Sequence, residues 1–435
     1  MMRKIGFLEA FSIGVGGMVG GGIFAVLGLT IDLAKGAAPV AFFIAGLIAL
    51  ITSYSYAKLS VKYKSEGGSI EYIVQAFGNN LFSSVINNLL LISYVIMLSL
   101  YAYAFGSYAS ALFFSKEVVW FHKLAASSVI ALFVIINLLG AFLTGKAEDI
   151  MVFIKVFILL VFVAVGIFSA DFHRLSPEYW ESSIKIITGG LIIFLAYEGF
   201  ELIANTAKDI ENPQKNLPGA FFASVIFVIF LYVSIAIVTV GNVSFAEAKK
   251  AQDYVLAIAT KPFFGEAGFI IISIAALLST ASAINATLYG GGRVGYLVAK
   301  LGELPSSFAK KVKEGYEGMI ILGLLAIIFA TSFDIQNISI AGSLGFLIVF
   351  GLVNLANFKL RNETNSNFLL PLVGFILCIT AAVILVGYNA KHSPESLKSS
   401  LLVIVIVVVF SVIYNKLGKK MQTVLDEDLR RVING

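Results

Sequence analysis

The chain has 435 residues, of which 59% are hydrophobic and 13% charged, and its mean hydropathy is +0.93. This composition excludes a soluble globular protein and indicates a polytopic membrane protein. The net charge of +5 does not indicate nucleic-acid binding, and the single cysteine, Cys378, excludes an internal disulfide framework. The first apolar segment is too long for the apolar region of a signal peptide and lacks a small-residue cleavage site, so we expect the N-terminus to be retained.

Apolar runs near 20 residues, separated by polar or Pro/Gly-rich breaks, predict twelve transmembrane helices in an all-α fold. Their limits are 7–32, 38–60, 82–113, 123–144, 148–170, 184–206, 217–241, 263–290, 318–333, 336–357, 368–388 and 398–416. The segment 65–78 between helices 2 and 3 is less apolar, and we interpret it as a re-entrant or surface helix.

Lysine and arginine residues are distributed unevenly between the predicted loops. With the N-terminus inside, one side receives 20 of the 31 basic residues and the other receives ten, while Lys155 belongs to neither side. Cytoplasmic loops of membrane proteins carry such an excess. The bias and the even number of spans predict a multi-pass protein of the cytoplasmic membrane with both termini in the cytoplasm.

The first predicted helix has three consecutive glycines, Gly20, Gly21 and Gly22, at its centre. Glycine is favoured where the backbone leaves helical geometry or approaches a ligand closely. Irregular backbone at membrane depth is tolerated only where protein buries it or where it lines a cavity. We therefore predict a discontinuous helix at a binding site. Close packing of small residues is the alternative, and we favour it for Gly14 and Gly28.

The sixth predicted helix carries two carboxylates and a glycine near its middle, Glu198, Gly199 and Glu201. Such residues inside a span are costly unless a cavity, a partner or protonation relieves them. Helices 1 and 6 lie five spans apart, which is the pattern of inverted repeats with paired discontinuous helices. The prediction is one transmembrane domain (1–435) with a first repeat (7–170), an inverted second repeat (184–357), helices 11 and 12 (368–416) and a cytosolic tail (417–435).

Four segments resemble motifs of the amino acid–polyamine–organocation (APC) superfamily. They are GVGGMVGGGIF (14–24), EGGSIEY with FG (66–72, 77–78), FLAYEGFE with ENPQKNLP (194–201, 211–218), and RVGYL with GELP (293–297, 302–305). The resemblance places the last of these in the loop after helix 8. It implies a LeuT-like five-plus-five inverted repeat and the transport of amino acids or related amines by alternating access.

A break in helix 1 offers two kinds of backbone group to an amino acid. The N–H groups that start its outer half suit a carboxylate, as does the helix dipole. The carbonyls that end its inner half, near Met18 and Val19, suit an ammonium group. The resemblance implies that the carboxylate binds at Gly20, Gly21 and Gly22, and the ammonium at carbonyls of helices 1 and 6. Relatives often have serine at the position of Gly21.

Helix 6 supplies the other candidate substrate-binding residues, Phe194, Leu195, Tyr197, Glu198 and Gly199. Packing in the core or against lipid is the alternative for the three large apolar side chains among them. If Glu198 faces the site, its carboxylate favours a second positive group on the substrate. If it faces water near the break, it only changes the local electrostatic field.

Lys155 is the only basic residue well inside a predicted span. Burial favours the neutral amine, so this side chain can take and release a proton. The resemblance implies a helix 5 lysine, as in proton-coupled members, that reaches the place of a sodium site between helices 1 and 8. Its candidate partners are the Gly16 carbonyl and the hydroxyl of Ser279 or Ser282. Glu201 matches an acidic position that some relatives use in proton-linked gating. The alternatives are a snorkelling anchor for Lys155 and a structural pair for Glu201.

The chemistry of an enzyme is not indicated by any motif in the sequence. The three histidines, His122, His173 and His392, fall in predicted outside loops without metal-ligand spacing, and there is no phosphate-binding glycine loop. We therefore expect no catalytic residues, no metal and no cofactor. The expected function is secondary active transport of an amino acid by proton symport, with the bilayer as the other partner. An amino acid/amine exchanger is the alternative within the carrier class. A channel is the alternative outside it, although no filter-like repeat is present.

Overall fold

The computed structural model describes residues 5–140 and 145–418, without the side chains of 145–149 and 417–418. Most of the predicted cytosolic tail (417–435), and the end of the predicted fourth span at residues 141–144, lie outside the described residues.

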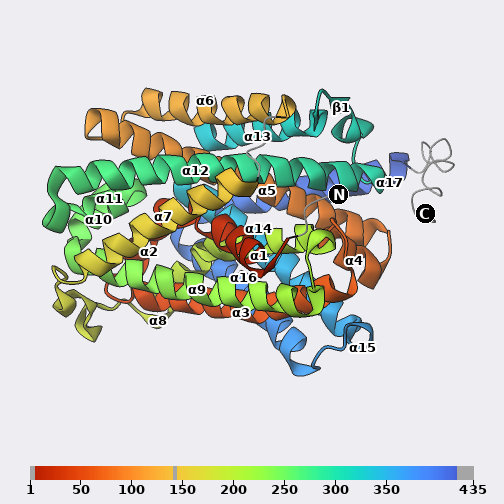
Figure 1. Ribbon diagram of the computed structural model, residues 1–435, viewed down its shortest axis with the longest axis horizontal. Coiled ribbons are helices and arrows are strands. Elements are labelled where there is room, and N and C mark those ends of the chain that lie inside the picture. The colour runs from red at the N-terminus through yellow and green to blue at the C-terminus, as the bar shows by residue number, and fades with distance from the viewer. Residues whose placement is uncertain (1–4, 141–144, 419–435) are drawn as a thin grey trace.

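Helices make up almost all of the described chain (Figure 1). In chain order they are α1 (Phe7–Met18), α2 (Gly22–Ala34), α3 (Ala38–Lys62), α4 (Ser69–Phe77), α5 (Leu81–Phe114), α6 (Val119–Leu138), α7 (Gly145–Gly166), η1 (Phe172–Leu175), η2 (Pro177–Tyr179), α8 (Ser183–Ile192), η3 (Phe194–Asp209), α9 (Pro213–Asn242), α10 (Phe245–Ala251), η4 (Gln252–Tyr254), α11 (Val255–Ile258), α12 (Lys261–Lys300), η5 (Ser306–Ala309), α13 (Glu317–Ser332), α14 (Ile335–Lys359), α15 (Arg361–Thr364), α16 (Leu369–His392) and α17 (Pro394–Gly418). One small antiparallel sheet pairs β1 (Lys311–Val312) with β2 (Gly315–Tyr316).

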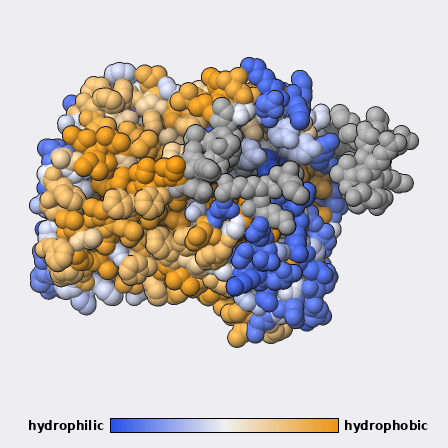
Figure 2. Space-filling view, viewed as in Figure 1, coloured by the Kyte–Doolittle hydropathy of each residue, from blue (hydrophilic) through white to orange (hydrophobic). Residues whose placement is uncertain are grey.

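Long apolar helices confirm the prediction of an all-α polytopic membrane protein. Within the described residues, nine helices are long and apolar enough to cross a bilayer, or ten if α1 and α2 form one bent span. Two shorter apolar helices, Ile150–Gly166 and Glu317–Ser332, lie where the fifth and ninth spans are predicted. The number twelve therefore stays a prediction. Figure 2 shows an apolar band between two polar ends, as expected of a protein whose middle is surrounded by lipid.

The first span is broken at the three glycines. α1 ends at Met18, α2 begins at Gly22, and the two axes are bent by 46°. Gly21 is the N-cap residue of α2. The chain therefore leaves helical geometry where the glycine cluster predicts it.

The sixth span is not interrupted by non-helical residues as the first span is; it changes from an α-helix to a 3₁₀-helix. α8 ends at Ile192, and from Phe194 the chain continues as the 3₁₀-helix η3 to Asp209; together they form one span of 27 residues. The predicted discontinuity within 194–201 is corrected accordingly. Runs of 3₁₀-helix this long are uncommon, and within a longer helix such a stretch often marks a functional hinge.

The span that contains α12 is longer than predicted. It continues to Lys300, so the RVGYL motif at 293–297 lies inside the helix and not in the loop after it. The run Gly290–Gly292 does not end the helix, because it packs closely against neighbouring helices. A Cβ on Gly292 would lie 2.6 Å from Met319 on α13, and one on Gly291 would lie 3.5 Å from Tyr94 on α5.

The first span and the sixth span meet at the centre of the bundle. α1 packs against η3 and α9, while α3 packs against α9 and α5 against α12. At the crossing of α1 and η3, a Cβ on Gly199 would overlap the backbone of Gly17, and one on Gly17 would lie 2.7 Å from the Gly199 carbonyl. The two backbones touch here, which only glycine permits.

Candidate functional site

The break in the first span presents unpaired backbone donors. The first N–H groups of a helix have no acceptor within that helix, and in α2 these belong to Gly22, Ile23 and Phe24. Together with the helix dipole they form a site that favours a negative charge. This arrangement suits the carboxylate of an amino acid.

Hydroxyl groups from two other spans hold the carbonyls on the opposite side of the break. The Tyr232 hydroxyl on α9 donates to the Met18 carbonyl at 2.6 Å. The Ser279 hydroxyl on α12 lies 3.1 Å from the Val19 carbonyl and 2.8 Å from the Gly20 carbonyl. A carbonyl oxygen has two lone pairs, so each can accept a further hydrogen bond from an ammonium group.

Each glycine of the cluster is packed against a different helix. A Cβ on Gly20 would lie 2.9 Å from Ala283 on α12, and one on Gly22 would lie 2.8 Å from Ala196 on η3. A Cβ on Gly21 would overlap the Tyr101 ring on α5 and lie 3.1 Å from Thr280. A serine at position 21 would therefore require Tyr101 to move.

Glu198 lies on the side of η3 that faces the break. Its side chain is buried, and its carboxylate interacts with the hydroxyl of Tyr101. The same Tyr101 ring lies against Gly21. The structure thus connects the Glu198 carboxylate to the glycine cluster through one aromatic side chain, which the sequence alone left open.

The other candidates on helix 6 are directed toward neighbouring helices. The Tyr197 hydroxyl donates to the Phe42 carbonyl of α3 at 3.0 Å. The Phe194 ring packs edge-on against Phe350 of α14, with centroids 6.0 Å apart. These contacts correspond to core packing, the alternative considered for these side chains.

Leu195 and Gly199 are likewise held by helix contacts. The Leu195 amide donates to the Ser343 hydroxyl of α14 at 3.3 Å, and that hydroxyl donates to the Ile192 carbonyl at 2.7 Å. Ser343 therefore stabilises the point at which α8 becomes η3. Gly199 lies at the backbone crossing with Gly17 described above.

Glu201 is attached to α4, the helix predicted in the segment 65–78. The Ser69 hydroxyl donates to Glu201 Oε1 at 2.6 Å, and the Tyr56 hydroxyl of α3 lies 2.6 Å from that of Ser69. Glu201 is 1% exposed, and its Oε2 atom has no hydrogen-bond partner among the described residues. Burying a polar atom without a hydrogen bond is energetically costly.

Lys155 on α7 reaches the first span. Its side chain is 3% exposed, and Nζ donates to the Gly16 carbonyl at 2.9 Å. A Cβ on Gly16 would lie 2.6 Å from Val152, so α7 packs closely on α1 at this point. Ser279 bonds to the Val19 and Gly20 carbonyls in the break between α1 and α2, and Ser282 is buried one turn along α12.

Tyr101 and Tyr232 are the site residues that sequence reasoning missed. Both are buried near mid-span, in α5 and α9. Tyrosines inside a span are a weak signal, because the chain contains 17 of them. Within the part of the chain that the structure describes, no group of three His, Cys, Asp or Glu residues could hold a metal ion.

The segment between α9 and α12 packs against the middle of α2. A Cβ on Gly28 would overlap the backbone of Gln252 in η4. Asp253, the next residue, is buried and accepts a hydrogen bond from Ser107 of α5 at 3.1 Å. This segment therefore packs against α2, the second half of the broken span.

A Gly28→Val variant is expected to displace η4 from α2, because the new side chain meets backbone that cannot rotate away. Overpacking of this kind typically costs about 1–3 kcal/mol. Thermal unfolding of the purified protein measures the effect, and Gly387→Val is the control because no atom lies within 4 Å of a Cβ there. Equal melting temperatures of the two variants would show that η4 is not packed as described.

Asp253 is expected to make stability depend on pH. Burial raises its pKa from 3.8 to about 7, the negative charges of Glu117 and Asp334 act in the same direction, and the Ser107 hydrogen bond opposes them. Glu117 itself interacts with His122 at 2.7 Å. Because the folded protein binds this proton more tightly than the unfolded chain, stability falls as pH rises from about 4 to about 7 and then levels off.

The Asp253→Asn variant should lack this fall, which amounts to about 1.4 kcal/mol per unit of pKa difference. The measurement is the difference in melting temperature between wild type and variant from pH 4 to 8. A difference that does not change with pH would contradict the assignment.

At the other end of the bundle, one carboxylate joins three segments. Glu66, in the turn between α3 and α4, forms an ion pair with Arg293 of α12, and its other oxygen lies 4.0 Å from Lys208 Nζ of η3. Ile5, just before α1, pairs with Ile210, just after η3. The start of the first span and the end of the sixth span are thus joined to each other, and the sixth span is joined to α12.

A bundle of apolar spans, the first of which is broken at its centre, defines a multi-pass membrane protein. Residues 5–413 match the family model described as amino acid permease, and the chain belongs to this family. The resemblance to the APC superfamily is therefore confirmed. The protein transports amino acids across a membrane, and its family is not one of enzymes.

Three relatives match nearly the whole chain. An uncharacterized protein of Methanocaldococcus jannaschii is 34% identical over 96% of this chain and 97% of its own length. The inner membrane transport protein YbaT of Escherichia coli is 32% identical over 89% and 90%. A methylthioribose transporter of Bacillus subtilis is 25% identical over 88% and 87%.

Proposed function

We propose that the protein is a proton-coupled amino acid symporter of the cytoplasmic membrane, with both termini in the cytoplasm. In this proposal, the chain forms two inverted five-helix repeats (7–170 and 184–357), and their relative movement exposes the break in the first span alternately to the two sides. Helices 11 and 12 (368–416) lie outside the repeats. The observation that carries the proposal is the contact between Lys155 Nζ and the Gly16 carbonyl.

Lys155 is suited to carry the coupling proton. A charge-assisted hydrogen bond from an ammonium to a carbonyl is stronger than a neutral one, especially away from water. In its charged form Lys155 therefore ties α7 to α1, as a bound cation would. After it loses the proton this tie weakens, which frees α1 to move relative to α7.

The substrate binds between the two halves of the first span in this proposal. Its carboxylate accepts hydrogen bonds from the N–H groups of Gly21, Gly22 and the residues that follow. Its ammonium group donates to the free lone pairs of the Met18 and Val19 carbonyls. Because the substrate contacts both halves of the first span, its binding affects the position of α1. Lys155 contacts α1 at Gly16, so substrate binding is coupled to this lysine.

Glu201 provides a second titratable group, which serves in gating. It joins η3 to α4 through Ser69, and these segments lie beside the ion pairs of Glu66. Protonation of Glu201 keeps this contact uncharged, whereas ionisation of a buried carboxylate with one unpaired oxygen is costly.

Uptake into proteoliposomes tests the function. An inward proton gradient should drive accumulation of a substrate amino acid, and an inward sodium gradient should not. Uptake that requires sodium and does not depend on the proton gradient would contradict the proposal. Counterflow without net uptake would favour an exchanger, and ion currents without saturation would favour a channel.

Glu198 favours substrates with a second positive group, because its buried carboxylate lies beside the break. A Glu198→Gln variant should lose binding of lysine or arginine by about tenfold or more, since removing one member of a buried ion pair costs several kcal/mol. Binding of leucine should change much less. Competition between labelled and unlabelled amino acids measures both. Equal losses for cationic and neutral amino acids would show that Glu198 does not select charge.

A further inference from the structure

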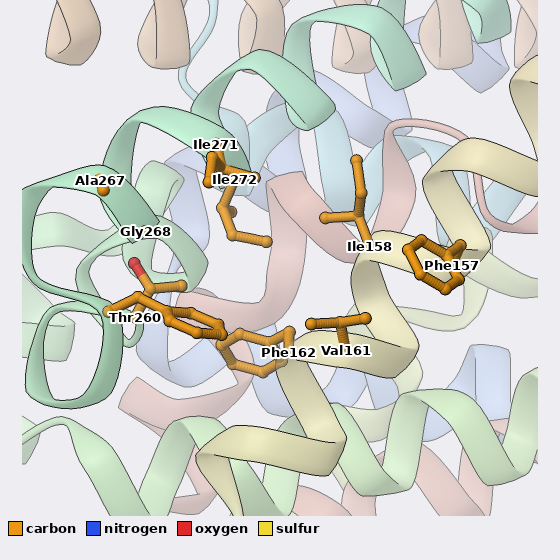
Figure 3. Close-up of a pocket in the computed structure, with 10 residues that line it drawn as sticks. Phe157, Ile158, Val161, Phe162, Thr260, Ala267, Gly268, Ile271 and Ile272 are labelled. Atoms are coloured by element: carbon orange, nitrogen blue, oxygen red, sulfur yellow. The ribbon is translucent and has the colours of Figure 1, made fainter.

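A narrow apolar groove lies between α7 and α12, and none of its lining residues belongs to the broken span (Figure 3). Its volume is about 250 Å³. Phe157, Ile158, Val161 and Phe162 of α7 form one wall, and the first turns of α12 form the other. We propose that this groove binds one acyl chain of a membrane phospholipid.

The groove opens onto the face of the protein that lies in the bilayer. Phe157, Phe264 and Ile271 at its mouth are 56%, 40% and 53% exposed, whereas Phe162 and Ile272 at its inner end are buried. The face that carries α7 is apolar over its middle (Figure 2). A ligand therefore enters from the hydrocarbon region and not from water.

The lining accepts only an apolar ligand. Thr260 is the sole hydroxyl residue among its lining residues, and its hydroxyl donates to the Ala257 carbonyl at 2.6 Å. No charged side chain lines the groove. An apolar cavity of about 150 Å³ remains dry and binds benzene, so this larger groove can hold a segment of hydrocarbon chain.

The groove is built by a local departure from helical geometry in α12. Gly265 has a φ of +61°, and the backbone kinks there before the regular helix begins. Ala267, just after the kink, lines the groove with a small side chain, and a larger one there would fill the space beside α7. A shallow gap between two parallel helices would not need such a kink.

Charged residues beside the groove mark the edge of the bilayer. Lys261 Nζ lies 2.7 Å from Glu266 Oε1 and 4.9 Å from the centre of the Phe269 ring. Lysine at the end of a span reaches the headgroup region while its stem covers apolar surface. The headgroup of the bound lipid would therefore lie near Lys261, with its chain running inward along α7.

Quenching of tryptophan fluorescence by brominated phosphatidylcholine in detergent micelles tests this proposal. Trp120 and Trp180, the two native tryptophans, are first replaced by phenylalanine. Phe157→Trp then places a reporter in the groove. Leu160→Trp places a matched reporter on α7 that is also exposed but does not line the groove.

If an acyl chain binds in the groove, the tryptophan at position 157 should be half-quenched at a lower fraction of brominated lipid than the tryptophan at position 160. The expected difference is about fivefold. Adding Ala267→Phe, which fills the groove from an exposed position, should remove the difference. Adding Ile270→Phe, exposed on the same helix outside the groove, should leave it unchanged. Identical quenching curves for the two reporters would overturn the proposal, as would a difference that Ala267→Phe does not remove. The readout does not depend on transport.

Discussion

A Gly21→Leu variant is expected to lose amino acid binding altogether. The new side chain would overlap the Tyr101 ring and press on Thr280, 3.1 Å from the position of the Cβ. It would also cover the N–H groups at the start of α2, which are the proposed partners of the substrate carboxylate. Binding measured by isothermal titration or by a substrate-induced shift in melting temperature gives the result.

The control for this variant is a leucine placed at an equally crowded glycine far from the break. In Gly323→Leu the Cβ would lie 2.6 Å from Val134, between α13 and α6. Overpacking there should lower stability by about 1–3 kcal/mol and leave substrate affinity close to that of the wild type. Normal affinity in Gly21→Leu would remove the assignment of the carboxylate site.

A Lys155→Ala variant is expected to lose proton-driven accumulation, with the internal amino acid level falling at least about tenfold toward the external level. Without the ammonium group, the Gly16 carbonyl has no charged partner from α7 and the proton has no carrier at this site. Exchange of internal for external substrate should persist, because the substrate site at the break is intact. Lys155→Met, which keeps most of the side-chain volume, separates the loss of charge from the loss of packing.

The exposed Lys398 provides the comparison for loss of a positive charge alone. Its side chain is 72% exposed and pairs only with Glu395 three residues earlier among the described ion pairs, so Lys398→Ala should accumulate substrate as the wild type does. Accumulation by Lys155→Ala under a pH gradient would show that another group carries the proton.

The helical class and the position of the first break could be predicted because both depend on local sequence. Hydropathy identifies spans, since the bilayer requires about 20 apolar residues per crossing. Three consecutive glycines at 20–22 interrupt the first span, because glycine disfavours helical geometry. The contact of Lys155 with Gly16 joins residues 139 positions apart, and it was proposed through the resemblance to a family and not through local pattern.

Tertiary contacts decided the features that were predicted incorrectly or missed. η3 is a 3₁₀-helix where Gly199 meets the backbone of Gly17 and where Ser343 holds the Ile192 carbonyl. α12 passes through three glycines because α5 and α13 pack against them. Tyr101 and Tyr232 resemble any other tyrosine in a span until the fold places them at the break.

The most direct test of the account is whether substrate and proton move together. Wild-type protein is reconstituted in vesicles that contain a pH-sensitive dye, and a substrate amino acid is added outside with no sodium present. The account predicts acidification of the interior that depends on the amino acid and is absent from vesicles with Lys155→Ala. Substrate uptake by the wild type without any change in internal pH would contradict proton coupling through Lys155.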